Sequence, residues 1–300
     1  MSEFELGIVV PVNQYGPDRV TTHWPGVRDF VLRAEEMGFD TIWTPDELVW
    51  FGGETPQGFW DGVSMAGAVA AMTSRAKVGT WVMSALHRNP GIIAKTAETL
   101  DDISGGRFVF GLGAGHEWPG QARAFGLPED RIFARFEEAI EIIVPLLREG
   151  QVTFEGTFHV ARDLPQLPRG PRPGAIPLLI GGNGPKGQRA AVRYADIYSC
   201  YIEERAVVEE VAPRLASLEA ICAELDRDPA TIGRSVGVSV RPLEAAGFSP
   251  NALSGSAAEI TDAVRTFRDA GFTQLEFMPG PGTIAMLEAL GPVVEAIHAD

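Results

Sequence analysis

Acidic, basic and aromatic side chains gather directly after apolar stretches of this sequence. Carboxylates and histidines can move a proton on a reacting group when their pKa is near the working pH, so they are the candidates for acid-base chemistry. Aromatic rings beside a phosphate-binding turn suit a planar, phosphorylated cofactor, and core packing is the alternative for any single tryptophan. The residues with this placement are Asp46, Glu47, Trp50, Phe51, Trp60, Trp81, Ser84, His87, Arg88, His116, Glu117, Trp118 and Tyr201.

The run from Gly181 to Lys186, GGNGPK, could hold a phosphate group. It follows an apolar stretch and opens a predicted helix, so unhindered backbone amides at a helix N-terminus would lie near the amine of Lys186. A tight turn at the end of a strand is an equally good interpretation of these glycines. The run is not a P-loop, because Gly187 and Gln188 stand where that motif requires a lysine and a hydroxyl.

Three other kinds of site find no support in the sequence. The run Gly111–Gly115, GLGAG, is similar to a dinucleotide-binding fingerprint, but His116 stands at the position of the last glycine. The 5 histidines share no metal-ligand spacing, so we predict no metal site. A serine hydrolase would need a Gly-x-Ser-x-Gly turn, which the sequence lacks.

The elements that would position the candidate residues alternate between strand and helix. Short apolar runs bounded by turn residues predict the strands, and apolar residues at helical spacing lie between them. Eight such units predict an α/β chain folded as a (β/α)8 TIM barrel with insertions, in a single domain of residues 1–300. A doubly wound open sheet has the same alternation and is the alternative. The predicted strands are Phe4–Val10, Asp40–Thr44, Lys77–Met83, Arg107–Gly111, Ile176–Ile180, Asp196–Ser199, Ser235–Val240 and Gln274–Phe277.

Barrel topology assigns each loop to one end of the molecule. Loops that follow strands form the active face, and all the candidate residues lie there. The insert Arg148–Ala175 instead follows a helix, and it contains a predicted hairpin of Val152–Phe154 and Thr157–Val160. We therefore place Arg169 and Arg172 at the opposite end, as solvated surface or a subunit contact.

Composition limits the partners and the compartment. The formal net charge of −15 argues against nucleic acid and anionic membranes, so an anionic ligand would be held by backbone amides and a few basic side chains. Only Cys200 and Cys222 are present, which fits a reducing compartment. The first residues lack a cationic region and lead directly into a strand, and no apolar run approaches membrane-spanning length. We expect a cytoplasmic protein.

Several motifs together resemble the luciferase-like monooxygenase superfamily, whose members use flavin mononucleotide (FMN) or the deazaflavin coenzyme F420. The resemblance runs from Gly7 to about Pro292. It implies a barrel with the cofactor lying across the carboxyl ends of the strands and its phosphate at the turn after the fifth strand. The motifs are Trp43-Thr44-Pro45-Asp46, Arg88-Asn89-Pro90, the segment Ala94–Arg107 with its specific Thr-Leu-Asp-x-Ile-Ser-x-Gly-Arg pattern, Gly111-Leu112-Gly113-Ala114-Gly115 and Gly181-Gly182-Asn183-Gly184.

The resemblance also implies the site residues. The third strand commonly carries a bulge, sometimes with a non-proline cis peptide, so we expect irregular backbone at Thr80, Trp81 and Val82. Relatives often have histidine after the aspartate of strand two, where this sequence has Glu47; the acidic residue and the histidine have thus exchanged places. The expected acid-base residues are Glu47, His116 and Glu117. The expected cofactor-binding residues are Asp46, Thr80, Trp81, Val82, Ser84, Gly113, Gly115, Gly181, Gly182, Asn183, Gly184 and Lys186.

We expect an oxidoreductase that uses a reduced flavin-type cofactor for hydride transfer to or from a small organic substrate. Coenzyme F420 is favoured because Asp46 and the GLGAG turn look more like the F420-dependent members. The alternatives are an FMN-dependent monooxygenase that activates oxygen and a non-catalytic flavin-binding protein. The expected partners are the cofactor and a small-molecule substrate, without nucleic acid or membrane, and a homodimer is compatible with the sequence.

Overall fold

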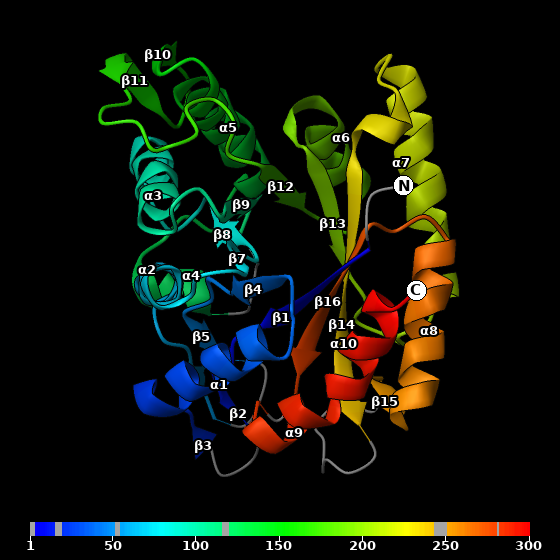
Figure 1. Cartoon of the computed structure of the whole chain (residues 1–300). Coiled ribbons are helices and arrows are strands. Elements are labelled where there is room, and N and C mark those ends of the chain that lie inside the picture. The colour runs from blue at the N-terminus through cyan, green and yellow to red at the C-terminus, as the bar shows by residue number, and fades with distance from the viewer. Residues whose placement is uncertain (1–3, 16–19, 52–54, 116–119, 243–250, 281) are drawn as a thin grey trace.

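The computed structural model describes residues 4–15, 20–51, 55–115, 120–242, 251–280 and 282–300 (Figure 1). Its centre is a parallel sheet of eight main strands that closes on itself, because the fourth strand pairs with the fifth and the first with the last. The predicted (β/α)8 barrel is confirmed. The strands are β1 (Glu5–Val9), β4 (Thr41–Thr44), β7 (Lys77–Thr80), β9 (Phe108–Gly113), β12 (Leu178–Gly181), β13 (Ile197–Tyr201), β14 (Gly233–Pro242) and β16 (Gln274–Pro279).

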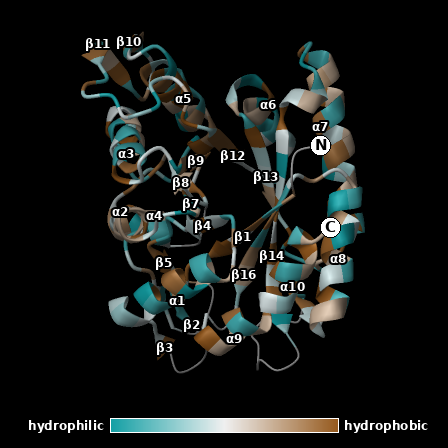
Figure 2. Ribbon diagram, viewed as in Figure 1, coloured by the Kyte–Doolittle hydropathy of each residue, from teal (hydrophilic) through white to brown (hydrophobic). Residues whose placement is uncertain are grey.

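Helices surround the strands (Figure 1), and hydrophilic and hydrophobic residues alternate along them because one face of each is buried (Figure 2). Several begin at a side chain that accepts a backbone hydrogen bond, namely Asp61, Asn89 and Ser256. The helices are α1 (Trp24–Glu36), α2 (Gly62–Met72), α3 (Pro90–Ile103), α4 (Gln121–Phe125), α5 (Ile132–Arg148), α6 (Pro185–Tyr194), α7 (Ala212–Glu224), α8 (Ala257–Asp269), α9 (Ile284–Ala289) and α10 (Gly291–His298), with 3-10 turns at Val208–Glu210 and Pro229–Thr231.

Short additional strands lie at both ends of the barrel. Two antiparallel pairs follow barrel strands, and a third, in the insert, lies at the opposite end of the view in Figure 1. The insert does form a hairpin, but its second strand is Val160–Pro165, and the prediction of Thr157–Val160 was wrong. Residues Thr157–His159 form the turn instead. The reason is that the carboxylate of Glu138 accepts hydrogen bonds from the backbone N–H groups of all three residues, at 2.7 to 3.0 Å. The short strands are β2 (Gln14–Tyr15), β3 (Val20–Thr21), β5 (Val49–Trp50), β6 (Gln57–Gly58), β8 (Met83–Ser84), β10 (Gln151–Glu155), β11 (Val160–Pro165) and β15 (Leu253–Gly255).

Two arginines fix the insert to the amino-terminal end of the barrel. Arg169 Nε donates to Glu98 at 2.6 Å, and Arg172 pairs with Asp101; both carboxylates belong to α3 and are almost fully buried. A buried carboxylate needs a cationic partner, so solvated surface was the wrong expectation for these arginines. Arg172 also donates to the carbonyl of Phe108 at the start of β9, which confirms that this arginine lies at the end opposite the active face.

The described ranges contain no helix that combines the length and apolar character needed to cross a lipid bilayer. Both cysteines, Cys200 and Cys222, are buried and unpaired.

The larger apolar cluster lies between strands and helices, and a smaller one inside the barrel contains Val9, Trp43 and Val109.

The interior layer also holds a buried carboxyl group, that of Glu276 on β16. The hydroxyl of Ser235 donates to its Oε1 at 3.1 Å, and the indole N–H of Trp43 donates to Oε2. Burial raises the pKa of Glu276 to about 8, with smaller contributions from the negative charges of Glu5 and Asp40, while the two hydrogen bonds act in the opposite direction.

Replacing Glu276 with glutamine should remove a pH dependence of the unfolding free energy. The pKa is 4.5 ordinarily and about 8 in the folded chain, so this group contributes stability that is complete below pH 4.5 and is lost as the pH rises through 8. In that window wild type should lose up to about 1.4 kcal/mol per pH unit relative to Glu276→Gln, measured by urea unfolding. Glu224→Gln, on the exposed side of α7, is the control. Parallel profiles for wild type and Glu276→Gln would contradict the assignment.

Candidate active site

The floor of the candidate site is an interruption of the third barrel strand. β7 ends at Thr80, the Trp81–Val82 peptide bond is cis, and β8 resumes at Met83. The irregular backbone expected at these residues is confirmed. The hydroxyl of Thr80 donates to the carbonyl of Gly111 at 2.8 Å and accepts from its N–H at 3.1 Å, so a side chain joins the two strands where the backbone ladder stops.

Glycines of the neighbouring strands make room for this floor. A Cβ atom on Gly113 would lie 2.7 Å from a methyl group of Val82, and one on Gly181 would lie 3.1 Å from the other. Gly115 has φ +108° and faces Ser84, whose Oγ would lie 2.9 Å from an added Cβ. The Gly-x-Gly-x-Gly spacing is thus explained by packing against the floor. Val82 itself is only partly buried, so a ligand can reach it.

Trp81 extends from the floor toward the opposite wall of the barrel. Its indole N–H donates to Ser199 Oγ on β13 at 3.1 Å, and its ring meets that of Tyr201 edge-on, with 5.9 Å between centroids. A Cβ atom on Gly237 of β14 would overlap the indole, so glycine is required there. The ring therefore covers the interior of the barrel and separates it from the pocket.

Asp46 organises the charged groups beside the floor. Its carboxylate accepts from Ser84 N–H at 2.9 Å and from both terminal nitrogens of Arg88, the longer contact being 2.8 Å, while His87 Nδ1 lies 3.5 Å away. Burial opposes the charge on Asp46, but the contacts with His87, Arg88 and Ser84 outweigh it and lower the pKa. Arg88 also reaches Asp61, the N-cap of α2, at 3.2 Å.

A glutamine absent from the predicted site residues connects Glu47 to this cluster. Gln121, from α4, lies with its Nε2 3.4 Å from Glu47 Oε2 and 3.5 Å from His87 Nε2, and its Oε1 accepts from the N–H groups of Leu48 and Val49. It is 2% exposed. Its only signal in the sequence was its place in a strand-to-helix loop. His87 was noted on the active face but was given no role.

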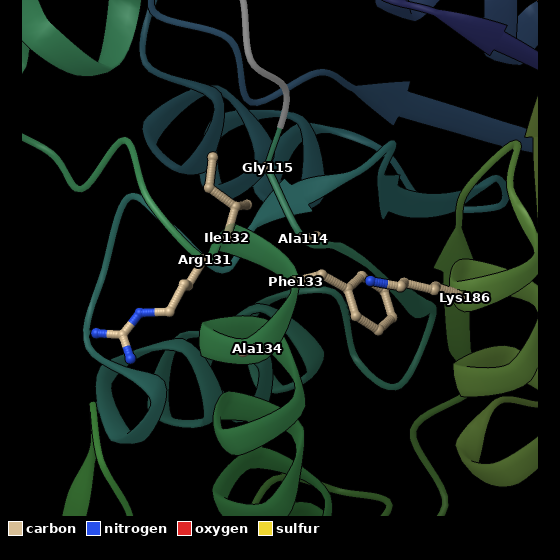
Figure 3. A pocket seen from close by; sticks show the side chains of 7 residues that line it. All are labelled: Ala114, Gly115, Arg131, Ile132, Phe133, Ala134 and Lys186. Atoms are coloured by element: carbon tan, nitrogen blue, oxygen red, sulfur yellow. The ribbon is translucent and has the colours of Figure 1, made fainter.

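A hollow of about 560 Å³ opens beside the GLGAG turn (Figure 3). Its lining combines the end of that turn with the N-termini of α5 and α6, where unpaired backbone N–H groups favour an anion. Lys186 points toward the ring of Phe133, with Nζ 5.5 Å from the ring centroid, whereas Arg131 points away and lies over Phe158. The lining residues are Ala114, Gly115, Arg131, Ile132, Phe133, Ala134 and Lys186.

The turn after β12 is built to start α6. Gly182 N–H donates to the carbonyl of Ser199, and a Cβ atom on Gly182 would lie 3.2 Å from the backbone of Gly187. Asn183 Oδ1 accepts from Tyr201 N–H at 3.0 Å and from Arg214 at 3.2 Å. Gly184 is the N-cap and offers no side-chain cap, which leaves the first amides of α6 open toward a ligand.

The remaining predicted residues, His116 and Glu117, lie outside the described residues. Among the described residues, no group of three or more His, Cys, Asp and Glu side chains is arranged to hold a metal ion. The described site residues thus form two groups. One is the floor with the charged residues around Asp46, and the other is the hollow at the N-termini of α5 and α6.

Comparison with known proteins places these features in a family context. The family model described as luciferase-like monooxygenase matches residues 4–246. The F420-dependent glucose-6-phosphate dehydrogenase of Kineococcus radiotolerans is 32% identical over 203 residues, which cover 65% of this chain and 56% of that protein. The pyrimidine monooxygenase RutA of Agrobacterium fabrum is 31% identical over 212 residues, which cover 66% and 57%. The chain thus spans little more than half the length of these curated relatives.

Solved structures show the same fold at low sequence identity. An F420-dependent secondary alcohol dehydrogenase in complex with an F420–acetone adduct superposes with a TM-score of 0.79 at 18% identity, covering 98% of this chain and 99% of the other. EDTA monooxygenase (EmoA) from Chelativorans sp. BNC1 gives 0.78 at 13% identity, with 98% and 94% covered. At these identities the likeness concerns the fold alone.

Replacing Asp46 with asparagine should destabilise the folded chain by about 3 kcal/mol at neutral pH, because the partly buried charge of Arg88 then keeps only its longer contact with the exposed carboxylate of Asp61. The pKa of Asp46 is lowered on folding, so its contribution is present above 3.8 and is lost as the pH falls through the lower folded value. Denaturant unfolding should show the difference from wild type shrinking below about pH 4. Asp262→Asn, in an exposed pair with Arg265, is the matched control. A difference that stays constant down to acid pH would refute this account.

Proposed function

The chain belongs to the luciferase-like monooxygenase family, and from that premise we propose that it is an oxidoreductase that binds a reduced flavin-type cofactor, with coenzyme F420 favoured, and acts on a small organic substrate. The observation that carries the proposal is the hollow beside the floor, bordered by the N-termini of α5 and α6 and by Lys186. This lining suits a phosphate group. When bound, the reduced cofactor would supply a hydride, or in the case of FMN would activate oxygen.

The residues present fit such a cofactor. Val82 and Trp81 are partly exposed and offer largely apolar surface to a planar ring. Lys186 and the open amides after Gly184 would hold the phosphate, and the glycines at positions 113, 115, 181 and 182 would let the cofactor approach their backbone. Asp46 would act at the ring edge through the groups it orders, Arg88 and Ser84. Together with Thr80 and Asn183, these are the cofactor-binding residues that we propose.

Proton transfer is assigned to Glu47, His116 and Glu117. When a hydride reaches or leaves a substrate carbon, the adjacent oxygen or nitrogen must gain or lose a proton, which requires a side chain within hydrogen-bond reach. Glu47 follows Asp46 in the chain and contacts Gln121, which in turn contacts His87. Gln121 therefore orients the carboxylate, and Glu47 holds or donates the proton at the substrate heteroatom.

The identity of the cofactor is the point on which the matched relatives divide, since they include an F420-dependent dehydrogenase and a monooxygenase. Two features of the sequence favour F420: Asp46 and the GLGAG turn. Recovery of the bound cofactor, followed by its absorption spectrum and mass, decides the question. Titration of the apo-protein with both cofactors is the second test, and tight binding of FMN without affinity for F420 would reverse the preference.

Lys186→Ala should weaken binding of the phosphorylated cofactor by about tenfold or more, because a charge-assisted contact with phosphate is lost. Riboflavin, or the deazaflavin ring without its phosphate tail, should bind equally well to wild type and variant in fluorescence titrations. Lys95→Ala is the matched control, since Lys95 contacts the carbonyl of Leu167 in the insert and does not line the hollow. If Lys186→Ala lowered the affinity for ligands with and without phosphate equally, Lys186 would not be the residue that binds the phosphate.

Glu47→Gln and His116→Gln should each lower turnover by about 100- to 10,000-fold at saturating cofactor while cofactor affinity stays intact. Steady-state rates with an established substrate, paired with binding titrations, separate the two effects. Unchanged turnover in both variants would refute the acid-base assignment. Normal cofactor binding without turnover over a broad substrate panel would favour the non-catalytic flavin-binding protein.

A further inference from the structure

A line of hydrogen bonds runs through the barrel interior from Glu276 to the floor of the pocket. Ser235 Oγ lies 3.1 Å from Glu276 Oε1, Ser199 Oγ lies 3.2 Å from Ser235 Oγ, and Trp81 Nε1 lies 3.1 Å from Ser199 Oγ. The two serines and Glu276 are at most 2% exposed. We call these four residues the interior line. It joins a buried ionisable group to the residue that covers the barrel.

The direction of the hydrogen bonds depends on the protonation state of Glu276. An indole N–H can only donate, so Ser199 Oγ must accept from Trp81, and Trp43 must donate to Oε2 of Glu276. With an ionised carboxylate, every hydroxyl of the line donates toward Glu276. A neutral carboxyl with its proton on Oε1 donates to Ser235 instead, and Ser235 then donates to Ser199. Ser199 Oγ then accepts hydrogen bonds from both Ser235 and Trp81, which alters the hydrogen bond that holds the indole of Trp81.

Neighbouring acidic groups on the adjacent strands have partners of their own. On the β1 side, Glu5 pairs with Lys77. Before β4, Asp40 pairs with His298 of α10 at 3.0 Å. Both carboxylates raise the pKa of Glu276 by their negative charge. These two carboxylates thus add to the effect of burial on the pKa of Glu276.

The neighbouring groups on β13 and β14 are an ion pair, a thiol and a phenol. Arg234 of β14 pairs with Glu219 of α7 at 3.2 Å. Burial raises the pKa of the Cys200 thiol to about 11 and raises that of Tyr201 above its usual value. A change in the interior line near pH 8 therefore belongs to Glu276.

We propose that Glu276 is a positioning residue of the cofactor site, which acts through Ser235 and Ser199 on Trp81 and so sets the orientation of the pocket floor. The inference rests on the proposed function, since it takes the floor to be the surface that the cofactor ring meets. The indole ring is partly buried and fits against the bare backbone of Gly237, and its hydrogen bond to Ser199 helps to fix its orientation. Glu276 touches neither cofactor nor substrate, so its effect is indirect.

Nitrogen-15 labelling of the tryptophan indoles tests the coupling in the apo-protein. In wild type, the indole N–H resonances of Trp43 and Trp81 should shift together with a midpoint near pH 8. In Ser199→Ala only the Trp43 resonance should shift, because the line is cut between Ser235 and Trp81. In Glu276→Gln neither should shift. Ser217→Ala, which removes a hydroxyl bonded to Gln188 outside the line, should behave as wild type. Trp81→Phe assigns the resonance.

A Trp81 resonance that does not shift in wild type, or that shifts unchanged in Ser199→Ala, overturns the inference. The second readout is the dissociation constant for FMN and for F420 between about pH 6 and 9. Wild type and Ser217→Ala should show a several-fold pH dependence, beyond titration of the cofactor itself, that is absent from Glu276→Gln and Ser199→Ala. Equal profiles in all four proteins overturn the positioning role. Failure of wild type to bind either cofactor overturns the proposed function instead. The indole shifts of the apo-protein would still show whether Glu276 is coupled to Trp81.

Discussion

The pocket depends on the fit of large side chains against glycine backbone. Val82 lies where it does because Gly113 and Gly181, on the strands beside it, have no Cβ atoms in its path. The same kind of packing is found inside the barrel, where Trp43 occupies space that a Cβ atom on Gly7 or Gly79 would fill. Interdigitation of this kind is how a small barrel fills its interior without voids. Any widening of these contacts would move the floor, and with it the groups that Asp46 holds.

The sequence predicted the architecture well because local signals determine it. All eight barrel strands lie within a few residues of the predicted ranges, since short apolar runs and helical stripes depend only on neighbouring residues. The insert hairpin was displaced because Glu138, some 20 residues away in the chain, holds its turn. Arg169 and Arg172 were misjudged for the same reason: their partners on α3 are distant in sequence.

The site was predicted less completely. The irregular backbone at Trp81 and Val82 came from a family resemblance, since a sequence alone does not reveal which glycine will face which side chain. Gln121 has no motif around it, and its role follows only from the way α4 places it between Glu47 and His87. Ser199 and Glu276 lie between apolar or aromatic neighbours, as inward-facing strand residues do, whereas Ser235 follows Arg234. Their mutual pairing depends on strand register, which periodicity does not specify.

The closure of the barrel also bears on how the chain is made. β16 pairs with β1 over more than 260 positions of sequence, as in the contact of Glu5 with Gln274, and β16 also pairs with β14. During synthesis the edge of β1 that pairs with β16 therefore stays unpaired until β16 has left the ribosome. An open parallel edge is prone to non-native pairing, and contacts this distant form slowly. The nascent chain thus passes through a long interval in which a chaperone that shields sheet edges would raise the yield of native protein.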